Sequence, residues 1–171
     1  MNAQAIAPSP PIATGVLTAD AYFPVLLETI RRAGERVDIA TYLFTHDLRQ
    51  PDCRGRLVSD ALCRAAARGV AVRVVVGRSQ SARLTSLNSA CARVLARGGV
   101  SVALRQPGAP PLHDKFALFD GTIAAVGGPN LTHTGLSSRG DLVVLSCEPD
   151  CCKTLGGRFE ALLRDADKVA P

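Results

Sequence analysis

Tryptophan is absent from this 171-residue chain, and only two tyrosines and five phenylalanines are present. Aliphatic side chains must therefore fill the interior, and nucleic-acid binding by aromatic stacking would rest on very few side chains. Long apolar runs are also lacking, because Arg, Asp or Gly interrupts every apolar stretch, so we expect no membrane-spanning helix. Residues 1–14 are rich in Ala and Pro and lack the basic start of a signal peptide. We expect a soluble protein that is cytoplasmic by default; a secreted or periplasmic protein would need an export signal outside this sequence.

Paired metal-binding cysteines are missing as well. The six cysteines contain no C-x2-C pair and no histidines at zinc-site spacing, so we expect neither a metal nor a cofactor. Their even number permits disulfides, with Cys147 and either Cys151 or Cys152 as the local candidates. We expect mostly reduced thiols, with Cys63 and Cys91 as small core residues on helices.

Lysine is scarce, since Lys115, Lys153 and Lys168 are the only three, and the net charge of +5 comes mainly from arginine. Six arginines crowd one segment of the chain: Arg73, Arg78, Arg83, Arg93, Arg97 and Arg105. Arg78 and Arg83 follow a predicted strand in a loop and could line a track for phosphates. The alternative is a solvated helix face with an adjoining loop, which needs no nucleic acid.

The length suits one domain, and a hydrophobic content of 47% is enough for a sizeable core. We expect a flexible arm over residues 1–17 and a single domain over residues 18–171. Hydrophobic periodicity predicts helices over residues 20–33, 57–68, 86–96 and 150–164. It predicts strands over residues 37–44, 70–76, 100–105, 116–119, 122–126 and 141–146.

The order of these elements predicts an α/β fold with a mixed sheet and helices on both of its faces. The early alternation of strand and helix favours parallel strands with right-handed crossovers. The turn at Asp120-Gly121 predicts a hairpin, which adds antiparallel strands. In the register that a short turn imposes, the hairpin brings residues 127–130 back beside His113.

The stretch from His113 to Asn130 carries the chemistry. On a strand, His113 and Lys115 share a face, whereas Asp120 lies at the far end beside the turn. A neutral imidazole can attack phosphorus, a lysine supplies a point charge for phosphate oxygens, and an asparagine amide adds a neutral donor. Gly127 and Gly128 let backbone N–H groups approach an anion. Each residue alone has an ordinary structural explanation, but together they indicate phosphoryl chemistry.

This stretch fits H-x-K-x4-D-x6-G-[GS]-x-N at every position and resembles the phospholipase D superfamily. Residues 37–45 are similar to the first core strand of the small bacterial endonucleases that carry a single motif. The resemblance covers roughly residues 21–163.

The resemblance implies that His113 forms a phosphohistidine while a second histidine protonates the leaving oxygen. With one motif per chain, it implies a homodimer that pairs two copies of His113. Lys115 and Asn130 would bind phosphate oxygens, Asp120 completes the motif, and no metal would take part. Asp141 stands where relatives have an acidic residue that orients the histidine, with a strand-capping role as the alternative. Gly128 stands where many relatives have serine, so a hydroxyl donor is lost.

Three functions follow from these features. The first is a metal-independent endonuclease with little sequence specificity, acting on DNA or RNA. The second is a phospholipase acting on phosphatidyl or cardiolipin headgroups, and the third is a noncatalytic accessory protein that keeps the fold. The loop over residues 106–112 leads into His113 and could shape the mouth of the site. His46 and His133 are expected to be ordinary structural or loop histidines.

Overall fold

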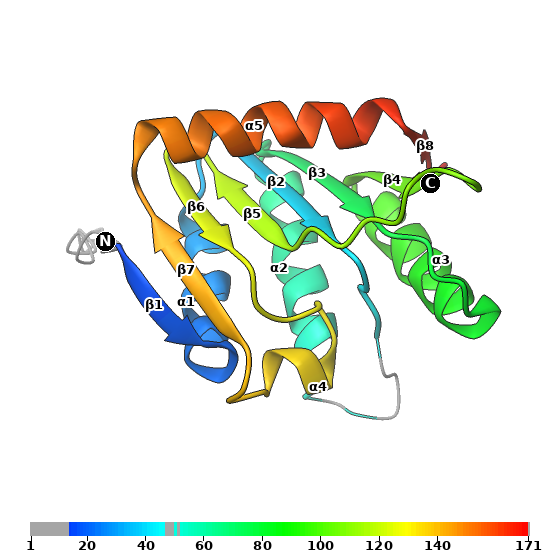
Figure 1. Cartoon of the computed structure of the whole chain (residues 1–171), viewed down its shortest axis with the longest axis horizontal. Coiled ribbons are helices and arrows are strands. Elements are labelled where there is room, and N and C mark those ends of the chain that lie inside the picture. The colour runs from blue at the N-terminus through cyan, green and yellow to red at the C-terminus, as the bar shows by residue number, and fades with distance from the viewer. Residues whose placement is uncertain (1–13, 47–49, 51, 171) are drawn as a thin grey trace, which may run out of the picture.

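Eight strands form one mixed sheet in the computed structural model, which describes residues 14–46, 50 and 52–170. The strands lie in the order β1-β7-β6-β5-β2-β3-β4-β8 (Figure 1). Their bounds are β1 Gly15–Thr18, β2 Arg36–Thr41, β3 Ala71–Val76, β4 Ser101–Arg105, β5 Phe116–Phe119, β6 Ile123–Val126, β7 Leu142–Ser146 and β8 Ala166–Lys168. β2, β3 and β4 are parallel, and the other pairings are antiparallel. The predicted mixed α/β sheet is confirmed.

Helices cover both faces of this sheet. Their bounds are α1 Ala19–Arg32, α2 Arg54–Ala67, α3 Ala82–Arg97, α4 His133–Leu136 and α5 Pro149–Arg164. The larger core cluster packs α1, α2 and α3 against one face, and two smaller clusters pack α5 against the other. Figure 1 shows α5 crossing the sheet on the side opposite to α1 and α2.

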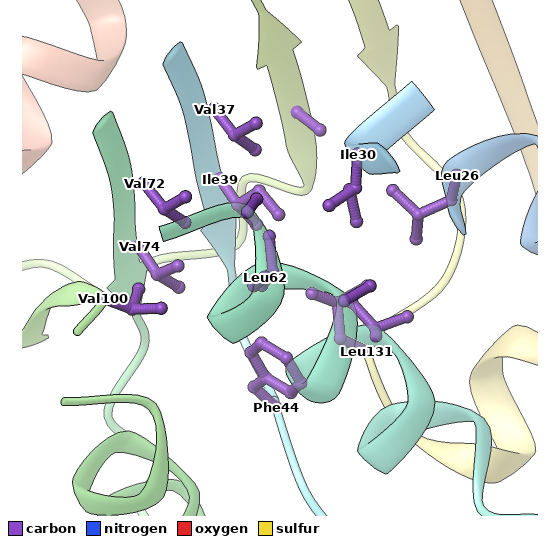
Figure 2. Packing of buried hydrophobic residues seen from close by; sticks show 14 of the residues in the cluster. Leu26, Ile30, Val37, Ile39, Phe44, Leu62, Val72, Val74, Val100 and Leu131 are labelled. Carbon is purple, nitrogen blue, oxygen red and sulfur yellow. The ribbon is translucent and has the colours of Figure 1, made fainter. Parts of the chain in front are cut away.

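The main core follows from the alternation of side chains along each strand. Val37 and Ile39 of β2 point to the same face as Val72 and Val74 of β3, and all four are buried. Figure 2 shows these residues with Leu26 and Ile30 of α1, Leu62 of α2 and the ring of Phe44. Removing such aliphatic surface from water is the main favourable term in folding. Scarce aromatics are therefore replaced by valine and leucine, as the composition predicts.

The hairpin that positions the site forms in the predicted register. Phe116 lies opposite Val126, and the backbone N–H of Gly127 donates to the carbonyl of Lys115 at 2.8 Å. The turn that joins β5 to β6 includes Asp120, whose φ is +49°, and Gly121, whose φ is +68°. Residues in this left-handed region are uncommon unless they are Gly, Asn or Asp. The pair Asp120-Gly121 therefore fits the turn that returns the chain to His113.

Several element boundaries differ from the predictions. β2 ends at Thr41, α2 begins at Arg54, and α4 forms within a stretch expected to be loop. α3 begins at Ala82 because the hydroxyl of Ser81 caps it by accepting from the N–H of Leu84. The two edge strands of the sheet, β1 and β8, were not predicted, because both are short. Residues 15–17 of the expected arm belong to β1, and residues 1–13 lie outside the described residues.

Two further expectations concern cysteines and membranes. All six cysteines are thiols rather than disulfides, Cys91 is buried on α3, and Cys63 is half-buried on α2. Burial raises the pKa of both thiols above the ordinary value, which favours their protonated form. Within the described residues, the helices are too short or too polar to cross a membrane.

Candidate active site

Most of the predicted site residues, but not Asp120, gather at one end of the sheet, between its parallel and antiparallel parts. β2 and β3 end there at Thr41 and Val76, and the neighbouring strand β5 begins there just after Lys115. Ligands of open α/β sheets bind beyond the carboxyl ends of parallel strands, where the strand order reverses. This end of the sheet is therefore a natural place for a substrate.

His113 is exposed, and its ring stacks on Tyr42. The two ring centroids are 5.2 Å apart, and the ring planes differ by 11°. The Tyr42 hydroxyl donates to Ser79 Oγ at 2.8 Å, and Gly77 leaves space for Tyr42, because a Cβ there would lie 2.9 Å from its ring. No described residue makes a hydrogen bond to the imidazole of His113. One face of the ring is thus supported by Tyr42, and the residue is open to solvent.

Lys115 lies on the same side of the strand as His113, as the alternation predicts. Its Nζ donates to the His113 carbonyl at 3.1 Å and lies 6.0 Å from the centroid of the Tyr42 ring. Asp114 points to the opposite side, where both carboxylate oxygens accept from Arg158 of α5 at 2.8 and 2.9 Å. The Arg158 guanidinium lowers the pKa of the Asp114 carboxyl. This ion pair holds Asp114 on the side of α5, so His113 and Lys115 lie on the opposite side of the chain.

Asn130 follows β6 and returns to the same end of the sheet. Its Oδ1 accepts from the N–H of Leu43 at 3.2 Å, and the N–H of Leu131 donates to the Leu43 carbonyl at 2.9 Å. Because Oδ1 is held by a donor, the Nδ2 group is the end of the amide that remains for a ligand. The structure therefore presents Asn130 as a donor, which suits a phosphate oxygen.

The two glycines before Asn130 have different roles. The N–H of Gly127 is used by the Lys115 carbonyl, so it extends the strand pairing and does not face an anion. Gly128 has a φ of +74°, and a Cβ there would lie 2.5 Å from Val143 Cγ2 and 2.9 Å from the Leu142 carbonyl. Serine would be strained at this position. The absence of the hydroxyl follows from how closely this turn packs on β7.

Asp120 lies at the opposite end of β5 from the other motif residues. Its carboxylate accepts from the backbone N–H groups of Gly34, Glu35 and Arg36 at 3.0, 2.9 and 2.8 Å. Burial raises the pKa of this carboxyl, but these three donors outweigh it and lower the pKa below its ordinary value. Asp120 thus joins the β5–β6 turn to the loop between α1 and β2, which favours a structural role over contact with substrate.

Asp141 directly precedes β7 at the site end of the sheet, whereas His113 precedes β5, which lies two strands away in the sheet order. Within the described residues, no hydrogen bond joins their side chains, and Asp141 is exposed. An orienting role for Asp141 stays a prediction.

The arginine-rich segment divides into structural and available side chains. Arg73 binds buried Asp38 and also Glu160 of α5, while Arg105 is buried and donates to three backbone carbonyls. Arg83 is exposed in the first turn of α3 rather than in the expected loop. Arg78 alone of the two predicted phosphate-binding arginines lies in a loop beside the site.

The two remaining histidines are engaged elsewhere. His46 Nε2 lies 3.2 Å from Cys91 Sγ, and burial lowers the His46 pKa. His133 begins α4, and its Nδ1 accepts from the N–H of Arg54 at 3.4 Å. Among the described residues, no three His, Cys, Asp or Glu side chains are grouped closely enough to hold a metal ion.

Sequence reasoning missed three residues that shape the site. Tyr42 falls within the predicted strand over residues 37–44, and no role in the site was predicted for Tyr42, Asp114 or Arg158. The position of Tyr42 directly after β2 was a signal that its ring could reach the sheet end. The Asp114–Arg158 pair joins residues 44 positions apart, so only the packing of α5 reveals it.

A family model described as the PLD-like domain of cardiolipin synthase matches residues 26–163. The chain belongs to the phospholipase D-like family. The members of this family act on phosphodiester bonds. A probable cardiolipin synthase, YwiE of Bacillus subtilis, is 27% identical over 161 residues, or 94% of this chain. The mitochondrial cardiolipin hydrolase of Danio rerio is 31% identical over 100 residues, or 58% of this chain.

This phospholipase D-like chain spans only 30% and 42% of the lengths of those two relatives. Two solved structures match it almost from end to end. The phospholipase D family member Nuc from Salmonella typhimurium has a TM-score of 0.74 and 20% identity, with 93% of this chain and 97% of that one covered. NucT from Helicobacter pylori has a TM-score of 0.72 and 15% identity, with 92% and 99% covered. These likenesses establish the fold.

Proposed function

We propose that this chain hydrolyses phosphodiester bonds in nucleic acid through a phosphohistidine on His113. The observation that carries the proposal is the convergence of three groups at one sheet end: an exposed imidazole, the Lys115 ammonium and the Asn130 amide donor. A nucleophile, a cation and a neutral donor are what phosphoryl transfer through histidine requires.

The proposed reaction has two steps. A neutral His113 nitrogen attacks phosphorus and forms a P–N bond, while the P–O bond to the leaving group breaks. His113 of a second copy donates a proton to that leaving oxygen. It then takes a proton from water, whose oxygen attacks phosphorus and breaks the P–N bond. Lys115 and Asn130 would hold the non-bridging oxygens in both steps, and the acid–base work contributes about 10²–10⁴-fold.

One chain supplies only one such histidine, so the proposed site is completed by a homodimer. An apolar patch on β1 and β7 supports this arrangement, because Val16, Leu142 and Val144 are 61%, 56% and 46% exposed. Val16 lies opposite Val144 in the sheet, and Leu142 lies beside Gly128 at the edge of the site. α5 packs on β2, β3, β5 and β6 and leaves this patch open. A second copy that covers this patch would also approach His113, Lys115 and Asn130 of the first copy, which together form one half of the proposed active site (the half-site).

Nucleic acid is favoured by the resemblance of this compact chain to the small bacterial endonucleases with a single motif, and by the loop arginine Arg78 beside the site. A second candidate is hydrolysis of cardiolipin or phosphatidyl headgroups. It is favoured by the family model and by the two curated relatives, which are named for cardiolipin. Both substrates use the same proposed phosphohistidine.

The test compares wild type with His113→Ala on DNA and RNA oligonucleotides and on vesicles containing cardiolipin, all in EDTA. His133→Ala is the matched control, because His133 lies outside the proposed site. We expect oligonucleotide cleavage that His113→Ala abolishes and His133→Ala retains, together with the mass of a dimer in analytical ultracentrifugation. Faster turnover of vesicles would reverse the choice of substrate. Equal activity in wild type and His113→Ala, or the absence of any turnover, would contradict the proposal and favour an accessory protein.

A further inference from the structure

A hollow of about 210 Å³ lies beside the half-site, between the loop that follows β3 and the loop that precedes His113. We call it the Arg78 hollow; it is lined by Arg78, Ser79, Gln80, Gln106, Pro110 and Leu112, among others. Its outer wall is stiff, because the loop contains Pro107, Pro110 and Pro111, and buried Arg105 donates to the Pro110 carbonyl at 3.2 Å. The hollow is therefore a feature of the folded chain rather than a gap in a pliable loop.

Arg78 supplies an oriented cation to this hollow. Its Nε donates to the Arg105 carbonyl at 3.0 Å, which fixes the plane of the guanidinium. This bond leaves the two terminal amino groups for another partner, and their fork matches two phosphate oxygens. The nearby carboxylates face elsewhere: Asp165 lies 3.5 Å from Arg105, and Asp167 accepts from Gln106. No acidic group that lines the hollow competes for Arg78 in the described part of the chain.

Two links place the hollow next to His113. Leu112 lines it and directly precedes His113 in the chain. Ser79 also lines it, and its hydroxyl accepts from Tyr42, whose ring stacks on His113. A single tyrosine thus spans from the imidazole to the wall of the hollow.

From this placement we infer that the Arg78 hollow binds the phosphate that neighbours the scissile phosphodiester on a polynucleotide. The inference rests on the proposed function and deepens it, since it specifies a substrate with a second phosphate close to the first. Nucleic acids carry a charge at every nucleotide, so a chain held at His113 would present such a phosphate to Arg78.

The experiment uses a dinucleoside monophosphate with no terminal phosphate, with a 5′-phosphate or with a 3′-phosphate. For the wild type, we expect the added phosphate on one side to raise kcat/KM about tenfold, as a charge-assisted hydrogen-bond pair in partly solvated surroundings would. In Arg78→Ala this ratio should fall to near one, and in Arg78→Lys it should be intermediate. Arg93→Ala removes an exposed arginine of α3 outside the hollow and should keep the wild-type ratio.

The same ligands, bound to His113→Ala with and without Arg78→Ala, separate this inference from the proposed function. An affinity gain from the terminal phosphate that disappears only with Arg78→Ala would support the hollow even if no cleavage occurred. A gain that survives Arg78→Ala, or one that Arg93→Ala reduces equally, would overturn it, because general electrostatics would then account for the effect. An Arg78-dependent gain seen with cardiolipin vesicles and not with these nucleotides would overturn the assignment to nucleic acid.

Discussion

The two ends of strand β5 hold their charged side chains in opposite ways. At the end where β5 begins, His113 is exposed; among the described residues none makes a hydrogen bond to its ring, and Lys115 donates only to the carbonyl of His113. At the other end, Asp120 accepts from three successive backbone N–H groups, those of Gly34, Glu35 and Arg36, where the chain enters β2. One motif thus combines two residues that are available for chemistry, His113 and Lys115, with one residue that has a structural role, Asp120.

The largest expected effect comes from the available end. Lys115→Met keeps the length of the side chain and removes its charge, so kcat/KM should fall about 10²–10³-fold, as it does when one donor to a developing charge is lost. The free energy of unfolding should change by less than about 0.5 kcal/mol, because the lost hydrogen bond is at the surface. Steady-state kinetics and urea unfolding measure the two quantities. Lys153→Met, on α5, is the charge-matched control. A large loss of stability in Lys115→Met would mean that Lys115, like Asp120, has a structural role.

A smaller effect, mainly on stability, is expected at the other end. Asp120→Ala removes an acceptor shared by three N–H groups, and it should lower the free energy of unfolding by about 2 kcal/mol. Water can reach these donors, which keeps the loss below that of a fully buried acceptor. Urea unfolding measures it, and kcat per folded molecule should fall far less than in Lys115→Met. If Asp120→Ala loses activity as Lys115→Met does while its stability is unchanged, the division of the motif is wrong.

The pH dependence of stability sharpens the same prediction. The folded-state pKa of Asp120 is lowered, so its contribution is fully present above the unfolded-state pKa of about 3.9 and is lost as the pH falls through the folded-state value. Urea unfolding at pH 7 and near pH 3 should therefore show less acid destabilisation in Asp120→Asn than in the wild type. Identical acid sensitivity in the two proteins would mean that the carboxylate is not stabilised in the folded state.

Local patterns explain why much of the fold and of the motif could be predicted from the sequence. The turn at Asp120-Gly121 and the apolar runs beside it fix the hairpin register, and this register sets where residues 127–130 return. Alternation along a strand likewise separates His113 and Lys115 from Asp114. These features depend on neighbours in the chain, and the structure confirms each of them.

The parts that could not be predicted depend on contacts between distant segments. The N–H of Gly127 donates to the Lys115 carbonyl in the strand pairing, so it is not available to an anion, whereas phosphate binding by the N–H of Gly128 stays a prediction. Arg78 and Arg83 were both predicted to lie in one loop, but Ser81 caps α3 between them, so Arg78 lies in the loop and Arg83 lies in the helix. Edge strands β1 and β8 were missed because short exposed strands carry little hydrophobic alternation.

The smallest expected effect concerns the stacking of Tyr42 on His113. Tyr42→Leu removes the ring that stacks on His113, and kcat should fall about two- to fivefold, since a stacked aromatic pair is worth about 0.5–1 kcal/mol. Tyr42→Phe keeps the stack and loses only the bond to Ser79, so it should lie between wild type and Tyr42→Leu. Proton NMR of the His113 ring gives an independent measure, because stacking shifts its resonances upfield and Tyr42→Leu should remove the shift. An unchanged shift would mean that the stack does not form in solution. The start of β5 would then be held by the Asp114–Arg158 pair and by the strand pairing at Lys115.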